Sequence, residues 1–448
     1  MGALSGMQAR TANSNYARAF SVVTSLFFMW GFITVLVDSL IPRLREIFEL
    51  TYFEAGLVQF AFFIAYGIAS LPAGALLSRI GYKNGILVGL ATMGMGCLLF
   101  WPAASLRVWP LFLFGYFVLA GGMTILQVAA NPYVSVLGPA QGAASRLNLS
   151  QAFNSLGTSI APLIGAMFIL SDNIKTSMEI KALNEADRLA YFAREAAAVE
   201  GPFMVLAGCL LALAAFIAFA NLPTVLTEKN VGTYRQVLKN KRLLMGAIAI
   251  FLYVGTEVAI GSYLVNYFLD MDLAEAIRNS GPMNRFCAAL LGKDLGQVDQ
   301  KGIVAAFVMF YWIGAMVGRF VGALLTKAFS PGKVLVAFGA GAITMVLASM
   351  LTLGFVSMAT ILLVGLFNSI MFPTIFTLAI EQLGDMKPKG SGILCTAICG
   401  GAFIPPLYGL FTDLAGFKLA FLLLVACYGY IMYYGWAPHN TVGRASRM

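Results

Sequence analysis

Two carboxylates interrupt apolar stretches of this sequence. Asp38 falls in a stretch at about 19–42, and Glu257 falls in one at about 243–268. An ionised carboxylate at the centre of a bilayer costs at least about 2.5–3.5 kcal/mol, so it persists only if it is paired, hydrated or protonated. A carboxyl group in that setting can bind and release a proton as its access to water changes. We therefore predict proton coupling at both acids; the alternative is a structural carboxylate bonded to neighbouring polar groups.

Neutral polar side chains also occur within the apolar stretches. Such groups are costly in lipid unless they are satisfied inside the protein or face a cavity. Carboxamides carry donors and acceptors that can bond the paired hydroxyls of a sugar, and aromatic rings can stack on a sugar ring. The predicted substrate-binding residues are Trp30, Gln59, Gln127, Asn131, Gln151, Asn154, Asn266, Asn368 and Phe372. For any single aromatic ring, helix packing is the alternative.

The composition is that of a membrane protein. Of 448 residues, 60% are hydrophobic and 11% are charged, whereas soluble domains carry roughly a quarter charged residues. An ordinary soluble enzyme and a disordered chain are excluded. The single histidine, the absence of a CxxC pair and the absence of a phosphate-binding GxxxxGK[ST] loop argue against metal chemistry and ATP hydrolysis. We expect no metal and no cofactor.

Twelve stretches are long enough to cross a bilayer as helices, since each crossing needs about 20 residues. They are predicted at about 19–42, 52–77, 84–102, 108–136, 146–170, 201–221, 243–268, 302–326, 333–354, 358–382, 390–411 and 417–437. The predicted organisation is an N-terminus (1–18), a six-helix half (19–221), a linker (222–242), a second six-helix half (243–437) and a tail (438–448). The fold is therefore predicted to be an all-α membrane protein.

The linker has a marked excess of basic residues. It contains one acid, Glu228, against Lys229, Arg235, Lys239, Lys241 and Arg242. Because positive loops stay on the cytoplasmic side, the linker and both termini are predicted to be cytoplasmic. The segment 171–200 is predicted to be a solvated connector that contains a short exposed helix.

Three sequence matches relate the two halves at nearly equal spacing along the chain. Gly74–Arg79 matches Gly322–Lys327; the other two pairs are Ala161–Gly165 with Pro405–Gly409, and Asn131–Pro132 with Phe372–Pro373. Parallel repeated halves are typical of major-facilitator transporters. The Gly-x-Leu-x-x-[Arg/Lys] pattern is similar to the loop signature of that superfamily, with Ser78 in place of its acid.

Small residues around both copies of this pattern let helices approach closely. The residues predicted to act in gating are therefore Gly74, Arg79, Arg319 and Gly322. Arg319 is expected to cap the C-terminus of a neighbouring helix or to pair with a carboxylate.

Several motifs resemble the fucose–galactose–glucose:proton symporter family. They are Phe28–Asp38, Gln59–Phe63, Leu71–Gly74, Gln127–Tyr133, Arg146–Asn154, Tyr253–Glu257 and Phe372–Phe376. The resemblance implies a sugar:proton symporter of the bacterial inner membrane, acting as a monomer. It also implies that Asp38 takes part in proton movement, and that Gln151 and Asn154 contact the sugar.

The sequence departs from the family's fucose carriers at two positions. Gln127 stands where those carriers have a glutamate, and Phe372 stands where they have a tyrosine. Because glutamine cannot carry a proton, Asp38 and Glu257 remain the predicted coupling acids. Together with Glu257, these residues resemble the glucose/galactose-type members.

Other functions stay open at this point. The transporter could be specific for fucose or N-acetylglucosamine, could couple to sodium at Asp38, or could work by facilitated diffusion. Export of a sugar or drug is also compatible with a buried acid. A sugar receptor without transport activity, or a membrane enzyme, is less compatible, because the sequence has neither a signalling domain nor a visible nucleophile–base set.

Overall fold

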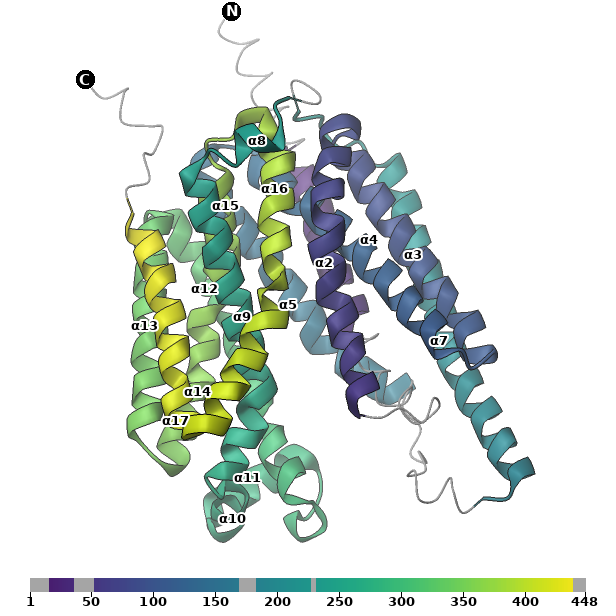
Figure 1. Ribbon diagram of the computed structural model, residues 1–448, viewed down its shortest axis with the longest axis vertical. Coiled ribbons are helices and arrows are strands. Elements are labelled where there is room, and N and C mark those ends of the chain that lie inside the picture. Colours follow the sequence, from purple (N-terminus) through teal and green to yellow (C-terminus); the bar gives the residue numbers. More distant parts are fainter. Residues whose placement is uncertain (1–15, 36–51, 169–182, 227–230, 438–448) are drawn as a thin grey trace, which may run out of the picture. The chain divides into compact units, whose positions relative to one another are not determined.

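The computed structural model describes residues 16–35, 52–168, 183–226 and 231–437, and these ranges are almost entirely helical (Figure 1). The long helices of the first half are Tyr16–Val35, α2 (Tyr52–Ile80), α3 (Tyr82–Ser105), α4 (Trp109–Val136), α5 (Ala143–Phe168) and α7 (Glu185–Phe219). Those of the second half are α9 (Lys241–Asp270), α12 (Gln300–Ala328), α13 (Pro331–Leu351), α14 (Gly354–Asn368), α15 (Met371–Ile380), α16 (Lys387–Thr396) and α17 (Gly400–Trp436).

The described helices fit the predicted number of membrane crossings. Ten segments are long and apolar enough to span a membrane. The last of these, Gly384–Trp436, contains α16 and α17 and is interrupted at Gly416, whose φ of 80° is outside the helical range, and each of its two parts is long enough for one crossing. The helix α5, which carries several polar side chains, is the remaining predicted span. The all-α membrane fold is therefore confirmed.

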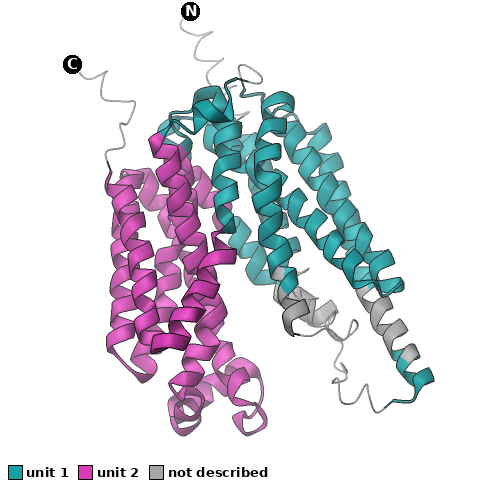
Figure 2. Ribbon diagram, in the orientation of Figure 1, with its two compact units in different colours: residues 1–143, 153–240, 380–399 teal, residues 144–152, 241–379, 400–448 magenta. Residues whose placement is uncertain are grey.

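The described residues form two compact units (Figure 2). Unit 1 comprises those within 1–143, 153–240 and 380–399, and unit 2 those within 144–152, 241–379 and 400–448. Each unit therefore combines most of one half of the sequence with a short segment from the other half. In unit 1 that segment contains α16, and in unit 2 it is the beginning of α5.

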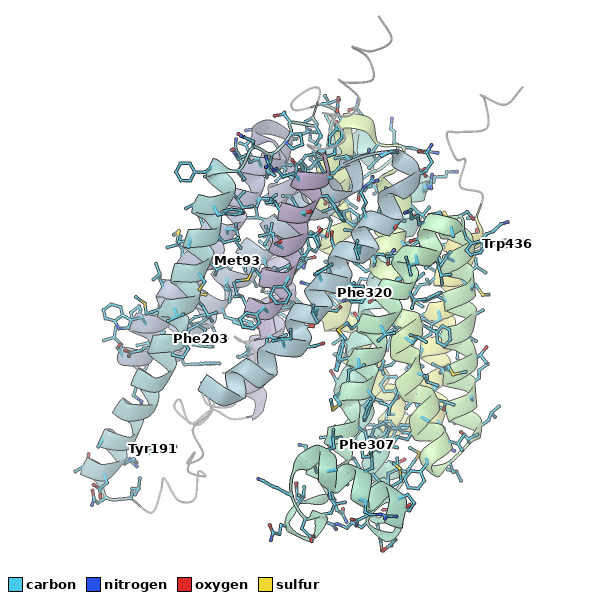
Figure 3. The ribbon with its side chains drawn as sticks, turned by 180° about the vertical axis from the view of Figure 1, so that it is seen from behind. Met93, Tyr191, Phe203, Phe307, Phe320 and Trp436 are labelled. Carbon is cyan, nitrogen blue, oxygen red and sulfur yellow. The ribbon has the colours of Figure 1, made fainter. Side chains whose placement is uncertain are left out.

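The core of unit 1 is built where α3 packs against α4 and α7. A β-carbon at Gly89 would lie 2.8 Å from the backbone nitrogen of Leu126, so only glycine permits this approach of α3 to α4. On the other face, Phe100 packs on Phe203 of α7 with ring centroids 4.1 Å apart. Met93 and Phe203 are both fully buried (Figure 3).

The core of unit 2 is built where α9 packs on α17, and α12 on α14. Near one end of α9, the hydroxyl of Tyr267 is 2.6 Å from that of Ser357, which lies 2.9 Å from that of Ser349. These buried hydroxyls satisfy one another, as groups removed from water must. The short helices α10 (Leu273–Asn279) and α11 (Gly281–Leu291) follow α9 and lie between the predicted spans 243–268 and 302–326.

The predicted short helix before the sixth span is part of a longer one. The structure places its residues at the start of α7, which continues from Glu185 to Phe219 without a break. Asn184 caps this helix by accepting a hydrogen bond from the backbone of Asp187 at 2.8 Å. The sequence interpretation separated the two parts because charge is confined to the first of them.

Candidate functional site

Glu257 lies on α9 of unit 2 within a group of polar side chains. Its Oε1 is buried and has no partner in good hydrogen-bond geometry. The hydroxyl of Tyr253, one helical turn earlier, is also buried and also lacks a partner in good hydrogen-bond geometry, and the positive charge of Arg319 on α12 attracts the carboxylate. A carboxylate with an unused buried oxygen can accept a proton there without losing an existing hydrogen bond.

Three further polar side chains extend this group into the interior of unit 2. The amide nitrogen of Asn368, on α14, donates to the hydroxyl of Tyr311, on α12, at 2.6 Å. Tyr428, on α17, interacts with Asn368. All three side chains have 0% exposure. The predicted sugar ligand Asn368 is thus placed inside the helix bundle, in contact with groups around Glu257.

Arg319 joins this group to the backbone of two neighbouring helices. Its Nε donates to the carbonyl of Ser369 at 3.2 Å, and one terminal nitrogen donates to the carbonyl of Gln151 at 3.5 Å. Ser369 is the C-cap residue of α14, where a cation is stabilised by the helix dipole. Arg319 therefore makes the predicted contact with a helix C-terminus, and its charge attracts the Glu257 carboxylate.

Unit 1 contains the polar side chains of α4. The amide nitrogen of Gln127 donates to the hydroxyl of Tyr66 on α2 at 2.5 Å, and Tyr66 is itself fully buried. Asn131, one turn further along α4, is fully buried as well. One N–H of Gln127 therefore holds α2 against α4, and its other N–H and its carbonyl oxygen can still bond the hydroxyls of a sugar.

Asn154 holds two helices of unit 1 together. Its amide nitrogen donates to the carbonyl of Phe27 at 2.9 Å. A β-carbon at Gly31 would lie 2.7 Å from the same nitrogen, so the helix Tyr16–Val35 can approach α5 only because residue 31 is a glycine. Trp30 is buried with its ring centroid 5.5 Å from that of Phe27.

The remaining predicted site residues are dispersed or lie outside the described part of the chain. Asp38 is outside the described residues, as is the side chain of Gln59. Phe372, on α15, is nearly buried against Phe376, with ring centroids 5.7 Å apart. Asn266 is exposed on α9, and Gln151 is buried on α5 of unit 2.

The predicted gating glycine Gly74 lies where α2 meets α16 in unit 1; we call this place the α2–α16 crossing. A β-carbon at residue 74 would lie 2.8 Å from the carbonyl oxygen of Pro388 and 3.3 Å from the Cα of Gly392. Nearby, the hydroxyl of Ser391 donates to the carbonyl of Val128 on α4 at 2.9 Å. Segments from the two halves of the sequence thus meet through backbone rather than through large side chains.

The linker takes part in this crossing. The short helix α8 (Tyr234–Val237) begins with a capping box formed by Thr233 and Gln236. The hydroxyl of Tyr234 donates to the carbonyl of Leu71 on α2. The ammonium of Lys389, only 5% exposed, donates to the carbonyls of Val231 and Gly232 at 3.0 and 2.8 Å. The linker is therefore attached both to α2 and to the start of α16.

The beginning of α5 makes the corresponding contact in unit 2; we call it the α5–α12 contact. Ser145 donates to the carbonyl of Ala323 on α12 at 2.7 Å, and Asn148 donates to the hydroxyl of Thr374 on α15 at 3.2 Å. The predicted gating residue Gly322 faces the side chain of Ile370, beside the same contact. Arg79, in the last turn of α2, is exposed.

Sequence reasoning missed the partners of these residues. It did not single out Tyr66, Tyr234, Tyr311, Lys389 or Tyr428. Tyrosines are ordinary packing residues in an apolar span, so their types give no signal of a polar network. A lysine at the start of a span is normally interpreted as a solvent-exposed loop residue, but Lys389 is buried.

Comparison with known proteins places the chain in a family. Residues 19–406 match the Major Facilitator Superfamily. The chain belongs to that superfamily. It is 46% identical to a glucose/galactose transporter of Brucella abortus over 95% of both chains, and 33% identical to the L-fucose-proton symporter of Escherichia coli over 93% and 92% of the two chains.

A solved structure supports the same assignment. The crystal structure of the transporter FucP in the outward conformation is similar with a TM-score of 0.84 and 32% identity, and the match covers 94% of this chain and 98% of that one. The predicted family, fold class and status as a transporter rather than an enzyme are confirmed. The chain is therefore a multi-pass membrane transporter of the fucose–galactose–glucose:proton symporter family.

Proposed function

We propose that this protein imports a hexose of the glucose/galactose type together with protons. The observation that carries the proposal is the buried, unused carboxylate oxygen of Glu257 inside a membrane-spanning helix. A relative named as a glucose/galactose transporter and relatives named as L-fucose-proton symporters support the choice of sugar and ion. The proton is the coupling ion, and no cofactor takes part.

Asp38 and Glu257 carry the coupling proton in this proposal. Their loading from outside favours sugar binding, and the two six-helix halves, 19–221 and 243–437, then exchange access from one side to the other. Coupling requires the loaded and empty forms to differ in their ability to switch. Loss of the charge at Asp38 is therefore expected to abolish uphill accumulation while sugar exchange continues.

The proposed sugar contacts are predicted residues that can offer a polar atom or an aromatic ring to a ligand. Gln127 offers its carbonyl oxygen, and Gln151 is held on α5 at the carbonyl that Arg319 contacts. Trp30 offers a ring face. Asn131, Asn154, Asn266, Gln59 and Phe372 complete the set.

We further propose that the α2–α16 crossing and the α5–α12 contact are the gates, with Gly74, Arg79, Arg319 and Gly322 as gating residues. The excess of basic residues in the linker supports a cytoplasmic location for these contacts, both termini and the residues 222–242, in a bacterial inner membrane. The protein works as a monomer, because each chain contains both halves.

The test is uptake of radiolabelled D-glucose into proteoliposomes with an imposed inward proton gradient and no sodium. Accumulation that a protonophore abolishes is the expected result. Accumulation that needs sodium instead would contradict proton coupling. If D-glucose is not taken up under either condition, competition of D-galactose, L-fucose and N-acetylglucosamine for uptake would replace the proposed substrate, and outward-directed transport would contradict import.

A further inference from the structure

We propose that Tyr66 is a positioning residue for sugar recognition. Its hydroxyl fixes the direction of the Gln127 carboxamide, so that the carbonyl oxygen of Gln127 accepts a hydrogen bond from one particular sugar hydroxyl. The inference rests on the proposed import of a hexose with Gln127 as one of its contacts. Tyr66 itself is only 1% exposed, so it acts through Gln127 and not by touching the sugar.

The backbone of α4 is held on both sides of Gln127. A β-carbon at Gly89 would lie 2.8 Å from the backbone nitrogen of Leu126, so α3 lies directly against α4 at that residue. The carbonyl of Val128 accepts a hydrogen bond from the hydroxyl of Ser391 at 2.9 Å. Because the residues before and after it are anchored, Gln127 retains freedom mainly in its side-chain torsions.

The hydrogen bond to Tyr66 removes this remaining freedom. The amide nitrogen of Gln127 donates to the hydroxyl oxygen of Tyr66 at 2.5 Å. The tyrosine ring is itself held, because it packs on Phe62 with ring centroids 5.2 Å apart, and Phe62 also packs on Tyr116 of α4, at 6.3 Å. A carboxamide is planar, with donors on its nitrogen and the acceptor on its oxygen. Holding the nitrogen therefore fixes where the oxygen lies.

Gln127 is the polar residue of this part of α4 that stays accessible. Its exposed fraction is 9%, whereas Thr124 and Asn131, about one turn before and after it, have 0%. Its carbonyl oxygen accepts no hydrogen bond within the described part of the chain, and it is not fully enclosed. This oxygen is therefore a group that this stretch of α4 offers to a ligand.

A fixed carbonyl oxygen selects a sugar by the direction of the hydrogen bond. It accepts from a hydroxyl, but it gains nothing from a hydrogen or a fluorine atom on the same sugar carbon, since neither can donate. Without the Tyr66 hydroxyl, the carboxamide can turn and offer an N–H in the same place. It must also be ordered again each time a sugar binds, which weakens binding by roughly two- to tenfold.

The experiment measures exchange of radiolabelled D-glucose in proteoliposomes loaded with unlabelled D-glucose, so no proton gradient is needed. Tyr66→Phe is expected to raise the half-saturating D-glucose concentration by roughly two- to tenfold. The maximal rate should stay within about twofold, because the lost interaction acts on sugar binding alone.

A series of monodeoxy and monofluoro D-glucoses, used as competitors of this exchange, tests the direction of the carboxamide. At one sugar position, the deoxy and the fluoro compound should both bind at least about fivefold more weakly than D-glucose, and in Gln127→Leu this penalty should disappear. In Tyr66→Phe, the penalty of the fluoro compound at that position should become smaller than that of the deoxy compound, because the turned amide donates to fluorine.

Tyr116→Phe is the matched control. It removes the hydroxyl of the other tyrosine that packs on Phe62, but this hydroxyl is not bonded to Gln127. The half-saturating concentration and the competitor series should be unchanged. In a Gln127→Leu background, Tyr66→Phe should cause no further loss of affinity, because the group that it positions is gone.

Several results would overturn the inference. They are an unchanged half-saturating concentration in folded Tyr66→Phe, a loss that persists in the Gln127→Leu background, or a lower maximal rate with unchanged affinity. In the unmodified protein, a fluoro compound that binds better than the deoxy compound at the Gln127-dependent position would mean that the nitrogen faces the sugar. If Tyr66→Phe does not fold, this comparison decides. Failure of the proposed function is separate, since the unmodified protein would then show no D-glucose exchange.

Discussion

The α2–α16 crossing of unit 1 and the α5–α12 contact of unit 2 join segments of the two sequence halves in different ways. In unit 1, Gly74 and Gly392 allow two backbones to meet, and the nearest atoms to residue 74 include the carbonyl oxygen of Pro388. In unit 2, side chains bridge the gap, since Ser145 and Asn148 reach acceptors on α12 and α15. One repeated motif therefore supports two kinds of contact.

The difference matters because side chains and helix backbones respond differently to added volume. A side chain can change rotamer to make room, but a helix backbone moves only if the helix moves. The α2–α16 crossing should thus be sensitive to added volume and the α5–α12 contact to lost hydrogen bonds. The linker adds to this asymmetry, because Tyr234 and Lys389 attach it to the crossing in unit 1.

The largest effect is expected from Gly74→Ala. The new β-carbon would lie 2.8 Å from the Pro388 carbonyl oxygen and 2.6 Å from the Tyr234 hydroxyl, so α2 and α16 must separate. Overpacking of this kind costs about 1–3 kcal/mol, which corresponds to a loss of roughly five- to 150-fold in the population with this crossing closed. The measurement is proton-driven D-glucose uptake, expected to fall by at least about fivefold on the same scale.

The buried thiol of Cys395, on α16, reports the separation directly. In a protein with the other five cysteines replaced, Gly74→Ala should make this thiol react faster with a maleimide. Gly67→Ala is the control on the same helix, because nothing lies within 4 Å of a β-carbon at residue 67. Equal uptake in the two alanine variants would show that the crossing tolerates volume.

Gly322→Ala should reduce uptake less than Gly74→Ala does. A second substitution, at Ile370, should partly restore uptake. The atoms that a β-carbon would meet at residue 322 belong to the side chain of Ile370. We expect Gly322→Ala to reduce uptake, and Gly322→Ala with Ile370→Ala to be less impaired than the sum of the two single changes predicts. Interaction energies between contacting residues are about 0.5–3 kcal/mol.

Additive behaviour of the two changes would mean that Gly322 acts by some route other than its contact with Ile370. At the α2–α16 crossing no such relief is available, because the carbonyl oxygen of Pro388 belongs to the backbone. A double variant, Gly74→Ala with Tyr234→Phe, should therefore stay as impaired as Gly74→Ala alone.

The sequence predicted which helix faces allow close packing, but not which elements pack against those faces. The repeated glycine motif correctly marked Gly74 and Gly322 as places of close helix approach, because small residues at a fixed spacing define one face of a helix. It could not identify α16 and α8 as the elements facing Gly74, since they lie more than 150 residues away in the chain. The contact of Arg319 with a helix C-terminus was predicted from an expected place at the end of a span, whereas the structure places Arg319 inside α12.

The polar residues show the same limit. Glu257 stood out because a charge in an apolar span is costly wherever its neighbours lie. The position of Asn368 was predictable, but its direction was not: helical periodicity does not tell whether a polar side chain faces a cavity or a tyrosine on the next helix. Its full burial next to Tyr311 follows from long-range packing.

Tyr234→Phe should weaken the crossing in unit 1 and leave the α5–α12 contact unchanged. The variant loses one hydrogen bond to the carbonyl of Leu71, worth about 1 kcal/mol, so Cys395 should react about fivefold faster. Burial raises the pKa of Tyr234 to about 12. The hydrogen bond from this hydroxyl is therefore fully formed below about pH 10, the ordinary pKa of tyrosine. It is lost, through loss of the hydroxyl proton, only as the pH approaches about 12.

The raised pKa of Tyr234 allows a direct test of the hydrogen bond between the linker and α2. The difference in Cys395 reactivity between the unmodified protein and Tyr234→Phe, measured as a ratio at each pH, should be constant from about pH 6 to 9, well below the ordinary tyrosine value. A ratio that falls to one within that range would mean that the hydroxyl does not act as a donor there.

The smallest effects are expected from the two serines at corresponding places in the repeat. Ser391 donates to Val128 in unit 1, and Ser145 donates to Ala323 in unit 2. Each alanine variant loses one neutral hydrogen bond, about 0.5–1.5 kcal/mol. If backbone contact dominates in unit 1, Ser391→Ala should slow glucose uptake less than Ser145→Ala does, because the glycine crossing and the linker still hold α16. Equal losses would remove the distinction between the two contacts, and a larger loss for Ser391→Ala would reverse it.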